Sequence, residues 1–246
     1  MTSNKTTDNF VTDLPIDRQY LPKHIAIIMD GNRRWAKKQN LSSGEGHKAG
    51  AKNLENVMNH CLKIGIQHLT VYALSTENWK KRSPEEVKGI FDLLVYLVTN
   101  NFQKYFNAGI KLNILGNFTV FPDYVIQAIN KALSVKVPNP KLVMNIALNY
   151  GGRDELISAI KKIVKDKTPE EEITEDLISE NLYTVGQPEP ELVIRPGGEF
   201  RLSNFLLWQS SYSELYFSDI LWPDFTPAEV EKAIYWYQQR DRRLGK

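Results

Sequence analysis

Short runs of apolar residues recur along the 246-residue chain, and longer segments with a helical spacing of apolar positions separate them. A run without alternation is typical of a strand that is buried on both faces of a sheet. Because such strands alternate with helices, we expect a single α/β domain: a mostly parallel central sheet of about six strands, flanked by helices. The clearest strands are predicted at residues 25–29, 68–74, 110–115, 142–148 and 191–194, and the longer helices at residues 49–64, 84–106, 121–133, 154–167 and 227–243.

The first apolar run ends abruptly at a polar cluster with candidate chemistry. Asp30, Gly31 and Asn32 follow the run, and Arg33 and Arg34 open a short basic helix. Open α/β sheets place ligands at the carboxyl ends of their strands. Arginines bind phosphate, whereas a carboxylate repels it unless a cation lies between them. We therefore interpret Asp30 as a Mg²⁺ ligand or a proton acceptor beside a phosphate-bearing substrate; a plain turn is the alternative.

Two other phosphate-site motifs match only in part. A phosphatase of the haloacid dehalogenase type needs an aspartate nucleophile two residues before Asp30, and Ile28 occupies that position. Gly44, Gly46 and Ala49 have the spacing G-x-G-x-x-A, but the dinucleotide-binding fingerprint requires a strand immediately before it, and none is predicted there. Both hypotheses are therefore disfavoured.

A second polar loop follows the strand at residues 191–194. It contains Arg195 and Arg201, two adjacent glycines, and Ser203, which is placed to cap a helix predicted to begin near Asn204. Backbone N–H groups at a helix start and forked arginine donors together bind phosphate well. This loop is therefore a second candidate anion site.

The helix predicted over residues 84–106 has an apolar arc that is wider than a single sheet-facing stripe. Plain packing in the core is the simpler interpretation. The alternative is that part of the arc lines a cavity for a long apolar ligand.

Composition restricts the class of protein. A net charge of +2 gives no reason to expect nucleic-acid binding. The single cysteine, Cys61, excludes an internal disulfide, and the four histidines lack the spacing of a metal site. We recognise no signal peptide and no membrane-spanning run, so we expect a cytoplasmic protein with, at most, peripheral contact at the inner face of the membrane. Residues 1–20 are predicted to form a flexible arm before one domain over residues 21–246.

Several blocks of the sequence together resemble one enzyme family. The blocks HIAIIMDGNRRWAKK, GHKAG, LSTENW, ALNYGGRDEL, LVIRPGGEFRLSNFLLWQSSYSELYF and LWPDF occur in the family's order from about residue 22 to the C-terminus. They are similar to those of the cis-prenyltransferases, most closely the bacterial undecaprenyl diphosphate synthases. The resemblance implies an enzyme that condenses isopentenyl diphosphate units onto an allylic diphosphate, typically farnesyl diphosphate, with Z stereochemistry. It also implies Mg²⁺ as cofactor, a hydrophobic tunnel, a homodimer, and undecaprenyl diphosphate, a carrier lipid for the cell wall, as product.

The resemblance also implies roles for individual residues. Asp30 is the central catalytic carboxylate and a Mg²⁺ ligand, and Glu214 completes the metal site, in the family across the homodimer. Asn78 belongs to a mobile loop implicated in the removal of a proton from isopentenyl diphosphate. The residues implied to bind substrates are Gly31, Asn32, Arg33, Arg34 and His47 for the allylic diphosphate, Arg195, Arg201 and Ser203 for isopentenyl diphosphate, and Trp35, Ser75, Thr76, Glu77, Trp79, Lys81, Arg82 and Leu202 around them.

The chain departs from the family's pattern at several positions. Ser43 stands where an arginine is usual, and Arg33, at a position that is usually glycine, is a candidate to supply the missing charge. Lys81 stands where another arginine is usual, and either Lys81 or the adjacent Arg82 can fill that role. Pro196 replaces a common threonine.

Rival hypotheses differ in what they require of the sequence. A trans-type prenyl synthase needs Asp-rich DDxxD segments, and this chain has no two adjacent aspartates. A non-catalytic partner subunit of a cis-prenyltransferase tends to lose the equivalents of Asp30 and the TENW block, and both are present. A cis-prenyl diphosphate synthase with a shorter product stays open, because product length depends on the depth of the cavity.

Overall fold

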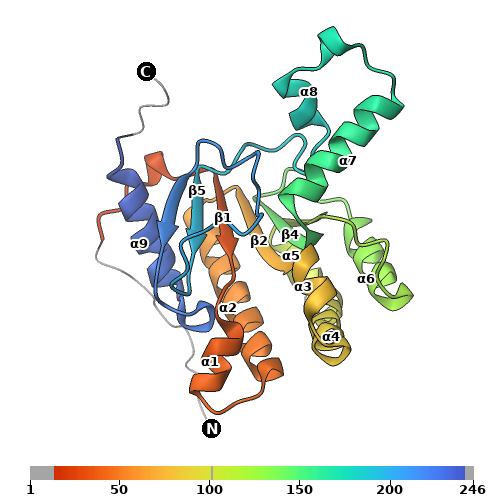
Figure 1. The fold of residues 1–246 in the computed structure, drawn as a ribbon. Coiled ribbons are helices and arrows are strands. Elements are labelled where there is room, and N and C mark those ends of the chain that lie inside the picture. Colours follow the sequence, from red (N-terminus) through yellow and green to blue (C-terminus); the bar gives the residue numbers. More distant parts are fainter. Residues whose placement is uncertain (1–13, 101, 242–246) are drawn as a thin grey trace.

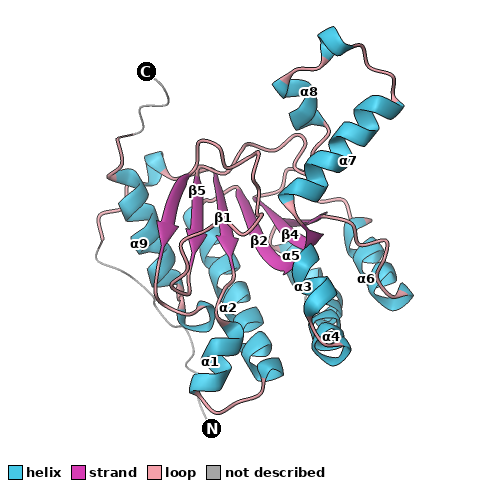
Figure 2. Ribbon diagram, in the orientation of Figure 1, coloured by secondary structure: helices cyan, strands magenta, loops and turns pink. Residues whose placement is uncertain are grey.

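The central element of the fold is a six-stranded sheet in which every neighbouring pair of strands is parallel. The computed structural model describes residues 14–100 and 102–241, and the strand order is β3-β4-β2-β1-β5-β6 (Figures 1 and 2). The predicted fold class is therefore confirmed. The strands are β1 (His24–Ile28), β2 (His68–Ser75), β3 (Ile110–Leu115), β4 (Leu142–Tyr150), β5 (Leu192–Arg195) and β6 (Glu214–Phe217).

Both faces of the sheet are covered, as parallel strands require. Ile25 and Ile27 of β1 belong to the larger hydrophobic core, whereas Ala26 and Ile28 belong to a smaller one, because successive residues of a strand point to opposite faces. Among the described helices, none is both long and apolar enough to cross a membrane. The helices are α1 (Asn32–Lys38), α2 (Ser43–Ile64), α3 (Thr76–Lys81), α4 (Pro84–Asn100), α5 (Phe102–Asn107), α6 (Asp123–Leu133), α7 (Gly152–Lys165), α8 (Glu175–Glu180) and α9 (Pro227–Gln238).

The helix predicted to start at residue 49 begins at Ser43 instead. Ser42 and Glu45 form a capping box, in which the Glu45 carboxylate accepts from the Ser42 N–H at 2.9 Å and the Ser42 hydroxyl accepts from the Glu45 N–H at 3.3 Å. Reciprocal capping satisfies N–H groups of the first turn, so a polar, glycine-containing stretch becomes helical. Gly44 and Gly46 consequently lie inside α2, which is incompatible with a dinucleotide-binding turn.

Two further predictions near the candidate site are wrong. Residues 76–81, expected in a loop, form helix α3, whose cap Ser75 accepts from the Asn78 N–H at 3.0 Å. Among the described residues no helix begins near Asn204; residues 203–212 form turns, and Ser203 and Asn204 both have positive φ. The residues of a right-handed helix have negative φ, so Asn204 cannot be the first residue of the predicted helix, and Ser203 has no helix there to cap.

The predicted N-terminal arm over residues 1–20 is described only from residue 14 onward. Arg18–Tyr20 forms a 3-10 turn. Gln238, the last residue of α9, donates from Nε2 to the carbonyl oxygens of Asp17 at 2.7 Å and Tyr20 at 3.1 Å. This part of the arm therefore lies against α9. That helix ends earlier than predicted, and the last two arginines of the chain lie outside the described residues.

Candidate active site

Asp30 lies just beyond the carboxyl end of β1, between two arginines from distant parts of the chain. Arg34 Nη2 is 3.1 Å from Asp30 Oδ1, and Arg195 Nη2 donates to Asp30 Oδ2 at 2.9 Å. Because β1 and β5 are neighbouring parallel strands, their carboxyl ends bring Asp30 and Arg195 to the same edge of the sheet. The two loops that the sequence singled out therefore meet at one carboxylate.

The close packing of these two loops depends on a glycine. Gly197 has a φ of +100°, and a Cβ at this position would lie 2.8 Å from Nη2 of Arg34 and 3.1 Å from the backbone oxygen of Asp30. A side chain here would push the loops apart, and the left-handed backbone favours glycine independently. Gly197 thus allows the two arginines to share Asp30.

Arg195 is held in place although it is charged and buried. Its side chain is only 5% exposed. Nη1 donates to Ser203 Oγ at 2.8 Å and also to the carbonyl oxygen of Arg201. Nε has no partner among the described residues. A fixed guanidinium whose Nη2 group already contacts a carboxylate is suited to bind an anion that enters from the side of Asp30.

These residues border a cleft of about 1140 Å³ at the carboxyl edge of the sheet, which we call the Asp30 cleft. Its lining holds six arginine and lysine residues but only two carboxylates, so it attracts anions. The lining comes mainly from β1, β2, α1, α2, α3 and the loop after β5. The predicted site residues in it are Asp30, Gly31, Asn32, Arg33, Arg34, His47, Ser75, Glu77, Asn78, Arg82, Arg195, Arg201 and Ser203.

Some predicted substrate-binding residues lie outside this lining. Trp35 Nε1 donates to Asp224 Oδ1 at 2.8 Å. The ring of Trp79 packs against Phe91 and Phe121, with centroid distances of 5.5 and 5.3 Å, so it faces the core beneath α3. The others outside the lining are Thr76, Lys81 and Leu202, the last of which packs against the smaller core.

Glu214, the second predicted metal ligand, lies far from Asp30 of the same chain. Ile25 of β1 pairs with Leu192 of β5, and Leu192 pairs with Glu214, so Glu214 is level with the start of β1. At ~3.3 Å per residue, Asp30 lies ~16 Å further along the strand direction, and two strand spacings of ~4.8 Å separate the residues laterally. One metal ion cannot join the two carboxylates within one chain. Glu214 Oε2 instead accepts from Arg240 Nε at 3.3 Å.

The cleft also contains residues that the sequence did not single out. Lys37 lies one helical turn after Arg33, so helical spacing was an available signal for it. Tyr72 of β2 lines the cleft and stacks on Phe205 at 4.7 Å. Asn204 was interpreted only as the start of a helix, and no pattern in the sequence revealed its place in the lining.

A small charged cluster lies where α2 meets the start of α4. His47 Nε2 donates to Glu86 Oε1 at 3.1 Å, and Arg82 Nη1 is 3.5 Å from the same oxygen. Burial lowers the pKa of His47, although the hydrogen bond to Glu86 opposes the shift. Burial acts to raise the pKa of Glu86, but the hydrogen bond from His47 and the charges of Arg82 and Arg33 outweigh it, so this pKa is lowered. Glu86 therefore stays ionised and fixes two residues of the cleft.

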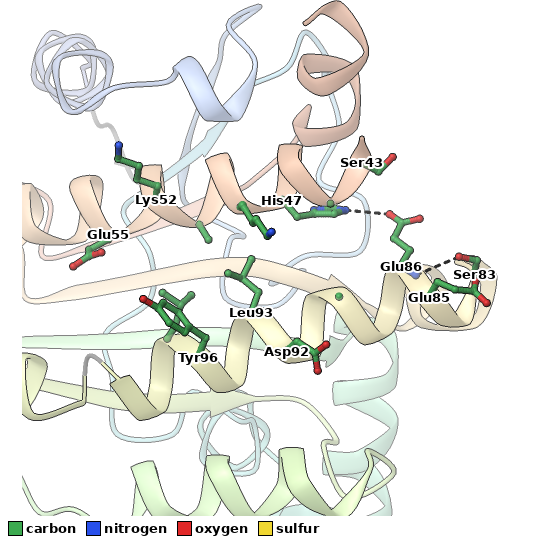
Figure 3. A pocket seen from close by; sticks show the side chains of 15 residues that line it. Ser43, His47, Lys52, Glu55, Ser83, Glu85, Glu86, Asp92, Leu93 and Tyr96 are labelled. Atoms are coloured by element: carbon green, nitrogen blue, oxygen red, sulfur yellow. Dashed lines mark hydrogen bonds and ion pairs between the residues drawn. The ribbon is translucent and has the colours of Figure 1, made fainter. Parts of the chain in front are cut away.

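A second cavity, of about 1060 Å³, forms a groove between α2 and α4 (Figure 3). Its surface is mostly apolar, and its volume is at the upper end of the range for small-molecule sites. In Figure 3, α4 presents Leu93 and Tyr96 on the side that faces α2, and α2 presents His47 and Glu55 on the side that faces α4. Ser43 and His47 line both the groove and the Asp30 cleft, so the two cavities adjoin there.

The wide apolar arc of α4 is divided between two environments. Val87, Phe91 and Leu94 are buried in the larger core, as the simpler interpretation requires. Leu93 and Leu97 line the groove, as the alternative requires. The core interpretation is therefore confirmed for the first three positions. That the other two serve a long apolar ligand stays a prediction, because the cavity is a groove and no enclosed tunnel is seen among the described residues.

Asp30 is the carboxylate of the cleft that lies between two arginines, and these arginines engage both of its oxygens. Within the described part of the chain, no group of three His, Cys, Asp or Glu residues is arranged to hold a metal. Mg²⁺ commonly uses one or two carboxylates and completes its shell with water and substrate phosphates. Asp30 could hold a metal ion in this mode if a phosphate took the place of its carboxylate on the arginines.

Comparisons of sequence find one family over nearly the whole chain. The family model described as "Putative undecaprenyl diphosphate synthase" matches residues 28–245. The chain is 46% identical to the isoprenyl transferase of Clostridium perfringens over 229 residues, which is 92% of this chain and 90% of that protein. It is 43% identical to the isoprenyl transferase of Neisseria meningitidis serogroup B over 235 residues, with 96% and 94% covered.

Comparisons of structure give the same fold. Lavandulyl diphosphate synthase from Lavandula x intermedia, solved with dimethylallyl diphosphate, matches with a TM-score of 0.88 and 32% identity, covering 93% of this chain and 100% of that one. A probable undecaprenyl diphosphate synthase from Campylobacter jejuni matches with a TM-score of 0.76 and 34% identity, covering 92% and 99%.

Proposed function

Because the chain belongs to the undecaprenyl diphosphate synthase family of cis-prenyltransferases, we propose that it extends farnesyl diphosphate with successive isopentenyl diphosphate units. The chain is an isoprenyl transferase of isoprenoid biosynthesis. The proposed product is a long-chain polyprenyl diphosphate with new Z double bonds, specifically undecaprenyl diphosphate, a carrier lipid for the cell wall.

The observation that carries this proposal is the junction of the Asp30 cleft with the α2–α4 groove. The cleft is lined by basic groups, the groove is mostly apolar, and Ser43 and His47 belong to both. A prenyl diphosphate has a charged head and a long hydrocarbon tail, so it matches the two adjoining cavities at once. At ~0.8 kcal/mol per buried methylene, a longer tail is held more tightly.

The proposed reaction needs positive charge around the diphosphate group of the allylic substrate. In each cycle the allylic C–O bond breaks, a C–C bond forms to C4 of isopentenyl diphosphate, C2 of that unit loses a proton, and inorganic diphosphate leaves. Fixed cationic donors stabilise the negative charge that grows on the leaving group. We assign Gly31, Asn32, Arg33, Arg34 and His47 to the allylic diphosphate, and Arg195, Arg201 and Ser203 to isopentenyl diphosphate.

Arginines engage both oxygens of Asp30, and a diphosphate competes with Asp30 for them. Binding of the allylic diphosphate to Arg34 and of isopentenyl diphosphate to Arg195 would free Asp30 to hold Mg²⁺ beside the phosphates. Mg²⁺, when bound, would neutralise charge on the leaving diphosphate. We assign removal of the C2 proton to the α3 wall of the cleft, where Asn78 and Glu77 lie.

Two positions that depart from the family's pattern have nearby substitutes. The charge of Arg33 contributes to lowering the pKa of His47, which supports Arg33 as the replacement for the arginine missing at Ser43. Arg82 lines the cleft and Lys81 does not, which favours Arg82 as the cation of that segment.

The proposal includes a homodimer. Glu214 cannot reach Asp30 of its own chain, and it begins β6, the strand at one edge of the sheet. A second copy that brings its Glu214 to the Asp30 cleft would complete the metal site. We place the enzyme in the cytoplasm, with peripheral contact at the inner face of the membrane, because its proposed product partitions into lipid.

The test is incorporation of radiolabelled isopentenyl diphosphate with farnesyl diphosphate and Mg²⁺, followed by chromatography of the extracted product. Wild type should extend the primer, and Asp30→Ala should lose more than about 10³-fold in rate, because it removes the proposed metal ligand. Asp166→Ala is the matched control, since Asp166 is an exposed aspartate at the end of α7.

Two alternatives predict other outcomes. A non-catalytic partner subunit would incorporate no label, alone or with Mg²⁺. A synthase with a shorter product would incorporate label but give a product below the undecaprenyl length; the likeness to lavandulyl diphosphate synthase makes this the second candidate.

A further inference from the structure

Asn204 connects three segments at the rim of the Asp30 cleft. Its backbone oxygen accepts from the Gly152 N–H at 2.7 Å, and its Oδ1 accepts from the Arg153 N–H at 2.9 Å. Its Nδ2 donates to Glu77 Oε1 at 3.1 Å. We propose that Asn204 is a positioning residue that holds α3, through Glu77, in register with the loop after β5.

The contacts with α7 explain why Asn204 itself is well placed. The first N–H groups of a helix lack partners within the helix, and Gly151, which precedes α7, provides no side-chain cap. Asn204 supplies two acceptors to this helix start from another segment of the chain. Its φ of +66° is a conformation that asparagine adopts more readily than most residues. Asn204 is therefore fixed to α7 through its two oxygen atoms, and its Nδ2 group is free to donate to α3.

The segments are packed closely at this point. A Cβ on Gly151 would lie 2.7 Å from Nδ2 of Asn204 and 3.0 Å from Oγ1 of Thr76, the first residue of α3. Only a glycine leaves room for α3 and the Asn204 amide to meet above the start of α7. The hydrogen bond between Asn204 and Glu77 is therefore enclosed by backbone on one side.

The connection links two substrate-binding regions of the proposed reaction, and the inference rests on that proposed function. Asn204 follows Ser203, which bonds Arg195, and Glu77 precedes Asn78 on α3. The isopentenyl diphosphate subsite and the α3 wall that we assign to proton removal are thus held at a fixed separation. Loss of the connection would leave each binding residue present but the two regions out of register.

Asn204→Asp tests the connection with little change elsewhere. Oδ1 is kept as an acceptor at the N-terminus of α7, where negative charge is favourable. The donor to Glu77 is lost, and two carboxylates face each other instead. We expect kcat/KM for isopentenyl diphosphate to fall about tenfold, and hydrogen exchange of the α3 amides to speed up while α7 is unaffected. Asn149→Asp is the matched control, because Asn149 also has positive φ and donates to the Asn117 carbonyl oxygen at 2.8 Å.

A double variant separates positioning from simple loss of structure. Asn204→Asp combined with Glu77→Gln exchanges the donor and the acceptor, so the same hydrogen bond can form in reverse. Asn204→Asp should cost about tenfold in the native Glu77 background and less than about twofold in the Glu77→Gln background. Equal losses in both backgrounds, or α3 amides that exchange at the wild-type rate in Asn204→Asp, would overturn the inference. Hydrogen exchange of the α3 amides can be measured without catalytic turnover. If the wild-type chain fails to extend the primer, the proposed function is contradicted, and the exchange data still test whether Asn204 holds α3.

Discussion

Arg195 donates from Nη2 to Oδ2 of Asp30 at 2.9 Å, across a separation of 165 residues in the sequence. The two partners differ in their surroundings. Arg195 is almost completely buried and is fixed by Ser203, whereas the side chain of Asp30 is 28% exposed and faces the cleft. A ligand that enters the cleft therefore meets a partly exposed carboxylate and a buried, fixed guanidinium, and an anionic ligand can compete with the carboxylate for the guanidinium.

The first prediction concerns the two Nη groups of Arg195, which donate to Ser203 and to Asp30, and Arg195→Lys tests it. An ammonium group keeps the charge but cannot reach Asp30 and Ser203 with the two arms that arginine uses. Two charge-assisted hydrogen bonds at ~1.5–3 kcal/mol each are affected, so kcat/KM for isopentenyl diphosphate should fall at least about a hundredfold. The exposed Arg18→Lys serves as control. Activity within threefold of wild type in Arg195→Lys would show that substrate binding does not need both Nη groups of the guanidinium.

The α2–α4 groove predicts control over product length. Gly89 lines the groove, and a Cβ there meets nothing within 4 Å, so Gly89→Phe projects an aromatic ring into open space. Phenylalanine also has a higher helix propensity than glycine, so the helix should tolerate the change. Chromatography of extracted products should show a shift to shorter chains with little change in the first condensation. Lys88→Phe, on the exposed side of α4, should leave the lengths unchanged; a shift in both variants, or in neither, would rule out the groove as the tail site.

That Asp30 and Arg195 lie in one site could be predicted from the sequence, because each follows an apolar run and parallel strands end at one edge of a sheet. The sequence did not predict the connection made by Asn204, since the left-handed turns after Ser203 depend on contacts with α7 that are remote in sequence. The sequence also did not predict the register of the strands. The pairing that places Glu214 level with the start of β1 follows from the order of the whole sheet.

Stability should fall in mild acid because of His24 in β1. This side chain is fully buried; Nδ1 donates to the Pro188 carbonyl oxygen at 2.7 Å, and Nε2 accepts from Thr70 Oγ1 at 2.7 Å. Burial lowers the pKa of His24 from 6.5 to about 4. Between these values the unfolded chain binds a proton that the folded chain does not, so the free energy of unfolding decreases as pH falls, by about 3 kcal/mol in total.

Urea unfolding of wild type and His24→Gln between pH 7 and pH 4 measures this contribution. The variant should be less stable at pH 7 but should lose less on acidification, because glutamine does not titrate. His47 and His60 also have lowered pKa values, so they add to the dependence of the free energy of unfolding on pH in both proteins. The difference between the two proteins in this pH dependence therefore isolates His24. Identical slopes would mean that the buried imidazole is not the source.

Product release should depend on a lipid surface if the tail is held in the groove. At ~0.8 kcal/mol per buried methylene, each added isoprene unit slows dissociation of the product into water. Phospholipid vesicles or detergent should therefore raise the steady-state rate and leave a single turnover unchanged. Equal multiple-turnover rates with and without vesicles would indicate that release does not limit the cycle.

The most discriminating prediction concerns the distance between Asp30 and Glu214, which no motion of one chain is expected to close. If a second copy supplies Glu214 to the Asp30 cleft, Asp30→Ala and Glu214→Ala chains should each be inactive alone but active after they are mixed and allowed to exchange subunits. In a mixed dimer, one cleft has Asp30 from the Glu214→Ala chain and Glu214 from the Asp30→Ala chain, while the other cleft lacks both residues. Random exchange of equal amounts makes half of the dimers mixed, each with one intact cleft. About a quarter of the wild-type rate per chain should therefore return.

A mixture of Asp30→Ala and Arg195→Lys chains is the control, because both residues belong to the same cleft. This mixture should recover no activity beyond the sum of its parts, because both substitutions fall in the cleft of their own chain and no mixed dimer restores either one. Recovery in the first mixture but not in the second would assign Glu214 to the partner's cleft, and failure of the first mixture to recover would exclude a shared metal site.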